Sequence, residues 1–316
     1  MWTANDSAPG GEKGEPVVRR LALFLLLALG TPISGIAGVQ TRPVLMTYPS
    51  GCKVLAYEEY GAGKPIVLLG GGPGINPVYL APVATMLAAA GRRVLLLDQR
   101  GTGRSADAIS CRERMNLAGS VADLEALRVY LRVDKLAITG HSFGGMLAMA
   151  YAQQHPDRVA GLLLLDTGPM SHADFPTESI AVRARLKPAE RTALQNASSD
   201  AQMDAIELPA YFADTGNTNR LQESIPPGEP FDNELVGELL GPDLRRFDVV
   251  DGVRKLRVPI TLVFGRSDPG FFVGAEIQKM QTNAKLLVVE HAGHYPWLEE
   301  PTGTASALKA AAGAMP

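Results

Sequence analysis

Histidine and cysteine are scarce in this 316-residue chain, which holds five histidines and two cysteines. Imidazole nitrogens and thiolates are the usual protein ligands of zinc, and they bind it in clusters of defined spacing. His291 and His294 are three residues apart, but no cysteine or carboxylate in the pattern completes a ligand set around them. We therefore expect neither a metal site nor another cofactor.

A strong excess of one charge is also absent. The net charge is −3 and the isoelectric point is near 6.0, so the chain has no broad positive field, and nucleic acid is not an expected partner. The phosphate-binding pattern G-x-x-x-x-G-K-[ST] does not occur. Gly101, Thr102 and Gly103 resemble a dinucleotide loop only faintly, and we do not expect a dinucleotide to bind there.

Residues 1–37 hold a short apolar run, Leu21 to Leu29, preceded by Arg19 and Arg20 and followed by small residues that end at Ala37. A charged flank, an apolar run and small residues are the layout of an export signal. An uncleaved membrane anchor over residues 21–37 is the alternative. We expect an exported protein, periplasmic or extracellular, with possible membrane association through residues 21–37.

In an exported protein the two cysteines can form a disulfide. A bond between Cys52 and Cys111 would tie the first strands to the loop after Asp98. Two separate buried thiols are the alternative.

After residue 38, apolar runs alternate with helical patterns. The runs show no polar alternation, so both faces of each strand are expected to be buried, as in a parallel sheet. They cover residues 66–69, 94–97, 136–138, 162–165, 260–264 and 286–289, and residues 53–60 predict an antiparallel strand at the start. Helices are expected at 79–90, at 120–131 with a cap formed by Ser120 and Asp123, and at 144–154. The fold class is α/β, with helices on both faces of the sheet.

Residues 170–245 interrupt this alternation and predict a helical lid inserted into a core formed by residues 38–169 and 246–316. The segment holds 13 acidic and six basic side chains, a net charge of −7. Such a lid would attract a cationic group, for example the free amino terminus of a peptide. A solvated face that keeps the lid soluble is the alternative.

The motif Gly140-His141-Ser142-Phe143-Gly144-Gly145 lies between a predicted strand and a predicted helix. In this setting G-x-S-x-G predicts a strained turn that exposes the serine hydroxyl as a nucleophile, and its glycines leave room where a side chain would collide. Ser142 is therefore the candidate nucleophile. Epoxide hydrolysis and dehalogenation would need a carboxylate at this position.

A serine nucleophile needs a base, and the base needs an acid to orient it. His294 follows the last predicted strand and has a glycine before it, so we favour it over His291. Asp268 follows the strand that ends near residue 264, and the order Ser142, Asp268, His294 is typical of this fold. Asp166 is the alternative acid.

The oxyanion of an acyl intermediate needs backbone donors. We expect the amide of Phe143, directly after the nucleophile, to be one of these donors. Gly70 to Gly74 follow the first predicted parallel strand, and Gly72 is the candidate for the second donor, ahead of Gly71.

Three motifs together resemble the proline iminopeptidase group of the α/β-hydrolase superfamily. They are Gly71-Gly72-Pro73-Gly74, Asp98-Gln99-Arg100-Gly101-Thr102-Gly103-Arg104-Ser105, and the serine turn. The resemblance implies an eight-stranded sheet, a helical cap, a Ser142–Asp268–His294 triad with Gly72 and Phe143 as oxyanion donors, and removal of an N-terminal residue, often proline, from peptides.

The chain departs from that group at Gly70, where the pattern has histidine, and at His141 and Phe143 in the serine turn. Many esterases and carbon–carbon hydrolases share the G-H-S-F-G-G form. A small ester or lactone is therefore the alternative to a small peptide as substrate, and a non-catalytic binding protein is a third hypothesis. The sequence leaves the oligomeric state open.

Overall fold

The computed structural model describes residues 43–316. The export signal or anchor predicted for residues 1–37 lies outside this range. Among the described residues, no helix combines the length and the apolar character needed to cross a bilayer.

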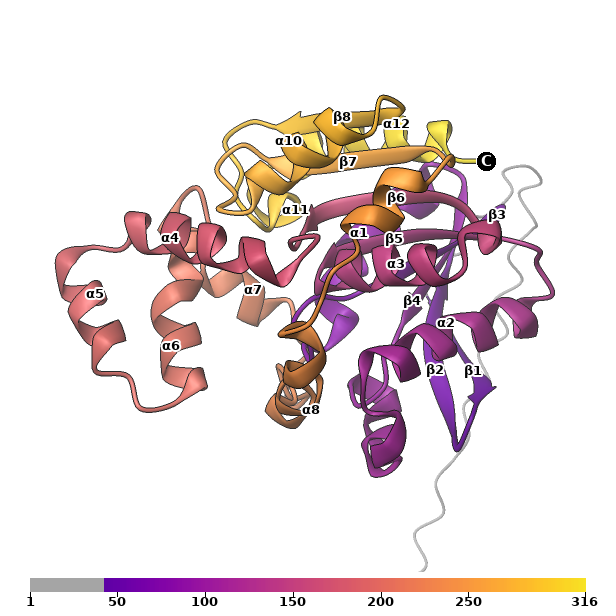
Figure 1. Cartoon of the computed structure of the whole chain (residues 1–316), viewed down its shortest axis with the longest axis horizontal. Helices are drawn as coiled ribbons and strands as arrows, with labels where there is room; N and C mark the ends of the chain where they lie inside the picture. Colours follow the sequence, from indigo (N-terminus) through magenta and orange to yellow (C-terminus); the bar gives the residue numbers. More distant parts are fainter. Residues whose placement is uncertain (1–42) are drawn as a thin grey trace, which may run out of the picture. The chain divides into compact units, whose positions relative to one another are not determined.

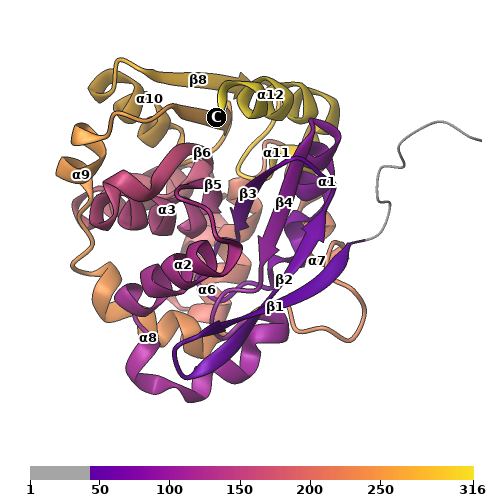
Figure 2. The same ribbon diagram turned by 90° about the vertical axis from the view of Figure 1, so that its right-hand side faces the viewer.

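Eight strands form one sheet in the order β1-β2-β4-β3-β5-β6-β7-β8 (Figures 1 and 2). The pairs β1–β2 and β2–β4 are antiparallel, and all other neighbours are parallel. The strands are β1 (Val44–Ser50), β2 (Lys53–Tyr60), β3 (Lys64–Leu69), β4 (Arg92–Leu97), β5 (Leu136–Ser142), β6 (Val159–Thr167), β7 (Ile260–Gly265) and β8 (Ala284–Val289). The expected mostly parallel sheet of eight strands is confirmed.

Helices cover both faces of this sheet (Figure 2). On β3, Ile66 and Leu68 pack into the cluster under α1 (Ala81–Ala89), α11 (Pro296–Glu299) and α12 (Pro301–Ala314). Val67 and Leu69 point the other way, toward α2 (Leu117–Leu131), α3 (Phe143–Gln154), α9 (Val250–Lys255) and α10 (Phe271–Met280). Both side-chain rows are buried, and this explains why the strands are continuous apolar runs.

Short 3-10 helices connect several of these elements. They are η1 (Pro77–Leu80), η2 (Gly103–Ser110), η3 (Arg112–Arg114), η4 (Pro156–Arg158), η5 (His172–Asp174), η6 (Leu208–Tyr211) and η7 (Thr215–Asn217). The helix expected at 79–90 is therefore split between η1 and α1.

The predicted cap of the second helix was wrong. Helix α2 begins at Leu117, and the side chain of Asn116 accepts a hydrogen bond from the amide of Gly119. Ser120 lies inside the helix. Asp123 is buried and pairs with Arg100 instead, so its carboxylate serves an internal ion pair.

The chain between β6 and β7 contains α4 (Phe175–Arg185), α5 (Pro188–Gln195), α6 (Asp200–Glu207), α7 (Asn219–Glu223) and α8 (Glu234–Leu244). Helices α4, α5 and α6 extend away from the sheet (Figure 1). Val182, Leu186 and Ala210 form a small apolar cluster of their own. Phe212 and Leu221 join the main core on the α1 side. They fix residues 170–245, called the inserted segment from here on, to the core at this point.

Cys52 and Cys111 form a disulfide, with their Cα atoms 6.4 Å apart. Cys52 is exposed in the turn between β1 and β2, and Cys111 is buried between η2 and η3. The bond ties the first hairpin to the segment after Asp98. Of the two alternatives for the cysteines, the structure therefore has the pair.

Candidate active site

Ser142 lies at the junction of β5 and α3, where the chain turns sharply from strand to helix. Its φ of 53° and ψ of −123° are rare for a residue with a side chain. A Cβ atom on Gly140 would collide with the backbone of Gly144, and one on Gly144 would collide with the backbone of Leu69. The glycines therefore allow the turn to close, as the motif predicts, and Ser142 is left half-buried.

The glycine loop after β3 lies directly against this turn. A Cβ atom on Gly71 would be 3.0 Å from Cβ of Ser142. The amide of Gly71 donates to the hydroxyl of Tyr79 at 2.7 Å and is thus occupied. Gly72 has φ +109° and its amide donates no hydrogen bond within the described part of the chain. Phe143 opens α3, so its amide belongs to the unsatisfied first turn.

Asp268 and His294 are in direct contact in the loops after β7 and β8. Nδ1 of His294 lies 3.1 Å from Oδ1 of Asp268, and both side chains are buried. The same oxygen accepts the amide of Gly270 at 2.9 Å. A carboxylate oxygen only accepts, so Nδ1 carries the hydrogen and Nε2 keeps the lone pair that a base needs.

The surroundings of His294 act on its pKa in opposite directions. Burial alone would lower the pKa, but the charge and hydrogen bond of Asp268, with a further contribution from Glu178, outweigh burial and raise it above its usual value. The raised pKa means that the imidazole takes up a proton readily.

Among residues 43–316, no hydrogen bond joins Ser142 to His294. The link between them runs through His141, the neighbour of Ser142. The ring of His141 lies 4.7 Å from the ring of His294, and its Nε2 atom is 3.0 Å from the carbonyl oxygen of His294. The carboxyl ends of β5, β7 and β8 thus bring Ser142, Asp268 and His294 to one edge of the sheet. Asp268 and His294 are in contact there, and Ser142 lies nearby.

His141 is fully enclosed in a polar chain. The carbonyl of His294 only accepts, so Nε2 of His141 carries the hydrogen and Nδ1 accepts from the hydroxyl of Tyr79 at 2.6 Å. Burial, helped by nearby His294, lowers the pKa of His141 well below its usual range. The neutral ring therefore joins the glycine loop, the serine turn and the His294 loop.

The two alternatives from the sequence do not form the contact between histidine and acid. His291 is exposed. Asp166, at the end of β6, is fully buried, and its Oδ1 accepts the amide of Gly265 at 2.8 Å. Asp166, Asp268 and His294 each place one potential ligand atom within 4.8 Å of the others. Within this group, Nδ1 of His294 is engaged with Oδ1 of Asp268.

Sequence reasoning did not identify Glu178 and Tyr211, which reach the site from the inserted segment. The Tyr211 hydroxyl donates to Oε1 of Glu178 at 3.4 Å, and the Tyr211 ring lies 5.1 Å from the ring of His294. Burial raises the pKa of Glu178, while nearby His294 lowers it. The only sequence signal was the acidic excess of residues 170–245.

Glu299, at the end of α11, connects the inserted segment to the loop that carries His294. Its carboxylate accepts the amide of Gly293 at 2.6 Å, next to His294. It also accepts the amides of Ala213 at 3.2 Å and Asp214 at 3.0 Å. One side chain thus holds two chain segments together beside His294.

Arg185, on α4, makes a similar connection on the side of the acid. Its guanidinium donates to the carbonyls of Phe212 and of Ser267, the residue before Asp268. The inserted segment is therefore fastened next to both Asp268 and His294.

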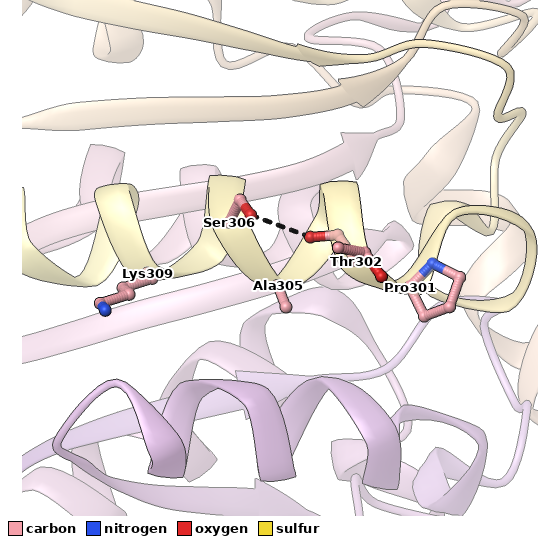
Figure 3. A pocket seen from close by; sticks show the side chains of 5 residues that line it. All are labelled: Pro301, Thr302, Ala305, Ser306 and Lys309. Atoms are coloured by element: carbon pink, nitrogen blue, oxygen red, sulfur yellow. Dashed lines mark hydrogen bonds between the residues drawn. The ribbon is translucent and has the colours of Figure 1, made fainter.

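A shallow groove of about 410 Å³ lies on the outer side of α12 (Figure 3). Its lining residues are Pro301, Thr302, Ala305, Ser306 and Lys309. None of them is a candidate site residue, and the groove plays no part in the arrangement around Ser142.

Hydrolases of the α/β class carry their nucleophile on such a strand-to-helix turn, with the acid and the histidine following in chain order. The sheet and the turn place this chain in that class. The family model described as alpha/beta hydrolase fold matches residues 64–301. The chain therefore belongs to the alpha/beta hydrolase family and is a hydrolase.

Proline iminopeptidases are among its relatives. The chain is 37% identical over 138 residues to a probable proline iminopeptidase of Leptolyngbya boryana, a match that covers 40% of each chain. It is 26% identical over 271 residues to the proline iminopeptidase of Lactobacillus helveticus, covering 78% of this chain and 91% of the relative. The predicted resemblance to this group is confirmed.

Solved structures agree on the fold. A proline iminopeptidase-related protein of Thermus thermophilus superposes with a TM-score of 0.70 at 25% identity, covering 87% of this chain and 99% of that one. Est816, described as an N-acyl homoserine lactone degrading enzyme, gives a TM-score of 0.62 at 22% identity, covering 84% and 99%.

Proposed function

We propose that this hydrolase acts through an acyl-enzyme on Ser142 and releases N-terminal residues from short peptides, as an aminopeptidase of the proline iminopeptidase type. In this proposal Asp268 and His294 complete the triad, and Gly72 and Phe143 supply the oxyanion donors. The observation that carries it is the buried hydrogen bond between Asp268 and His294 beside the strained Ser142 turn.

The first step is attack of the Ser142 hydroxyl on the substrate carbonyl, with the proton passing to Nε2 of His294. Asp268 holds the ring by its Nδ1–H and stabilises the imidazolium. His294 then gives the proton to the leaving amine. In free enzymes the serine–histidine hydrogen bond is often long and tightens when substrate binds. A similar adjustment brings His294 to Ser142 here.

The tetrahedral intermediate places a negative charge on the former carbonyl oxygen. The amides of Gly72 and Phe143 flank Ser142 and have no other acceptor among the described residues, so they are free to donate to this oxygen. Water then attacks the acyl-enzyme with His294 as base, which releases the N-terminal amino acid.

Glu178 supports a peptide substrate. It is a half-buried carboxylate of the inserted segment, close enough to the base for its charge to raise the pKa of His294. A carboxylate near the proposed base suits the protonated amino terminus of a peptide, which lies one carbon from the scissile amide. We propose that residues 170–245 act as a lid and that Glu178 is its amine-binding group.

The test of this assignment compares Glu178→Gln with Glu223→Gln, which removes an exposed carboxylate from the same acidic segment. We expect Glu178→Gln to raise KM for proline and alanine arylamides about tenfold, as for loss of a hydrogen bond to a charged group. KM for a short acyl ester without an amine should stay unchanged, and Glu223→Gln should affect neither. If the two variants had equal effects, the overall negative charge of the acidic segment, and not Glu178 in particular, would be responsible for amine binding.

Activity itself is tested with a panel of aminoacyl-arylamides and short acyl esters. We expect kcat/KM to be highest for N-terminal proline or another single residue with a free amine. The alternative, an ester or lactone hydrolase with the same triad, has support in the G-H-S-F-G-G motif and in the structural likeness to Est816. Higher kcat/KM and selectivity for esters or lactones would favour it.

A non-catalytic binding protein is tested by covalent labelling. A fluorophosphonate probe should modify Ser142 in the folded wild type and leave Ser142→Ala unmodified. A folded wild-type protein that stays unlabelled at Ser142 would contradict the proposed mechanism.

We also propose that the protein is exported, to the periplasm or the extracellular space. The disulfide between Cys52 and Cys111 supports this proposal, because disulfides persist in oxidising compartments. Cell fractionation with mass spectrometry of the mature N-terminus tests it. A protein recovered only with the cytosol would contradict it.

A further inference from the structure

Asp166 is held in an unusual state at the end of β6. Its side chain is fully buried, and its φ is 41°, a left-handed value that Asp tolerates better than most residues. Oδ1 accepts one hydrogen bond, from the amide of Gly265 at 2.8 Å. The position is costly in backbone conformation and in desolvation, which suggests a role beyond filling space.

The neighbour of Asp166 is the triad acid. A carboxylate oxygen of Asp166 lies within 4.8 Å of a carboxylate oxygen of Asp268 and of a ring nitrogen of His294. Oδ2 of Asp166 and Oδ2 of Asp268 are both buried, and neither has a hydrogen-bond partner. A buried acceptor without a donor is destabilising, and there are two of them in one cluster.

The charges around the pair favour a proton on Asp166. Burial first, and then the charge of Asp268 with further contributions from a hydrogen bond to Asp268 and from Glu299, raise the pKa of Asp166 well above its usual value. The amide of Gly265 opposes this shift. In contrast, Asp268 has the imidazole of His294 as its partner. Among residues 43–316, neither carboxyl group has an ion pair with lysine or arginine.

We propose that Asp166 is a neutral carboxylic acid whose Oδ2–H donates to Asp268 and positions the triad acid. This one hydrogen bond gives a partner to both unpaired Oδ2 atoms. Asp268 is then the only ionised carboxylate of the pair. This inference deepens the proposed function, because it rests on the triad role of Asp268. Asp166 is then a positioning residue that acts on His294 through Asp268.

The protonation state can be measured without any substrate. The infrared spectrum of the wild type at pH 8 should contain the carbonyl band of a protonated carboxylic acid, and Asp166→Asn should remove one such group. Asp98→Asn is the matched control: it removes another buried aspartate at a strand end, whose pKa is raised only to about 6 and which is therefore ionised at pH 8. The acid band should survive in this control.

The positioning role is measured by the rate of fluorophosphonate labelling of Ser142 against pH. An asparagine at 166 keeps a donor for Asp268 and tolerates the positive φ, so Asp166→Asn should label within about threefold of wild type. Asp166→Ala removes the donor and should slow labelling about tenfold or more. In Asp166→Ala only, the loss of labelling at acid pH should set in at a higher pH. Without the donor from position 166, the negative charge of Asp268 acts more strongly on His294 and raises the pKa of its imidazole further.

Three results would overturn the inference. In the first, Asp166→Asn leaves the acid band unchanged. In the second, Asp166→Asn labels as slowly as Asp268→Asn, which would make Asp166 the ionised acid. In the third, a folded Asp166→Ala labels like wild type. The infrared result stands even if no peptide or ester is hydrolysed, so failure of this inference and failure of the proposed function are distinguishable.

Discussion

Single side chains around His294 determine how readily it takes up a proton. Burial opposes protonation, and Asp268 and Glu178 favour it strongly enough to raise the pKa. His294, as the proposed base, would work only in its neutral form, so we expect this balance to decide the pH at which the enzyme becomes active.

The pH dependence of kcat/KM follows from this balance. The pKa of His294 is raised, so activity should fall as the pH drops through a midpoint above about 6.5, the ordinary value for histidine. Glu178→Gln removes one of the groups that raise the pKa and should move the midpoint to lower pH. The check is a profile of kcat/KM from pH 5 to about 9 for both proteins. A midpoint that lies below that of free histidine, or that ignores the substitution, would contradict the assignment.

Removal of the side chains of the proposed triad should separate chemistry from folding. Ser142→Ala should lower kcat by about 10⁶, the scale known for loss of a triad nucleophile. Asp268→Asn should cost roughly 10⁴ if it orients His294. Steady-state kinetics measure both losses, and circular dichroism checks that both variants fold. If Asp268→Asn cost little, the orienting role would have to pass to Asp166.

Sequence alone could indicate Ser142, Asp268 and His294, because each stands at a predicted strand end and in a fixed chain order. It could not indicate Tyr79 or Glu178. Tyr79 acts on His141 across 62 positions, and Glu178 approaches His294 from another element. These roles depend on tertiary contacts that no local pattern encodes.

At the scale of elements, strands with a continuous apolar run were predictable, and the exposed edge strand without such a run was not. The first strand, β1, was missed because it lies at the sheet edge, is half exposed and contains Pro49. Proline is tolerated there because an edge strand need not donate every amide. Within the predicted helical lid, no residue pattern marked α4 or α5 individually, since the apolar residues of α4 pack on a cluster of only three buried side chains.

The link between the inserted segment and the His294 loop gives a prediction at this scale. Glu299→Gln leaves only one accepting oxygen for the amides of Gly293, Ala213 and Asp214. We expect kcat to fall about tenfold with a smaller change in KM, because the base is displaced while substrate contacts remain.

Glu300→Gln is the matched control for this change. It makes the same chemical substitution one position later, where the side chain forms no hydrogen bond or ion pair within residues 43–316. Kinetics of both variants, with thermal unfolding to verify folding, make the comparison. Equal losses of kcat, or a loss confined to KM in Glu299→Gln, would refute a role in placing His294.

At the scale of the whole described chain, the disulfide joins parts that are 59 residues apart. Closing a loop of this length stabilises a protein by about 4 kcal/mol in the chain-entropy model. The double variant Cys52→Ser, Cys111→Ser should therefore lose stability of this order. Urea unfolding measures the loss, with the reduced wild type as a second measurement.

Loss of the disulfide should lower the stability of the protein more than it affects the reactivity of Ser142. Both cysteines lie away from Ser142, Asp268 and His294 in the structure, so labelling of Ser142 at low temperature should be retained. A double variant as stable as the oxidised wild type would contradict the stabilising role of the bond.

The Tyr79–His141 bridge has a practical consequence for protein engineering. Its central ring is neutral and its hydrogen bonds reach Gly71 on one side and the backbone of His294 on the other. Mutagenesis aimed at new substrates should leave these positions constant, since any exchange would disturb three loops simultaneously. Diversity is better introduced in helix α5, which contributes none of the side chains described around Ser142, Asp268 and His294.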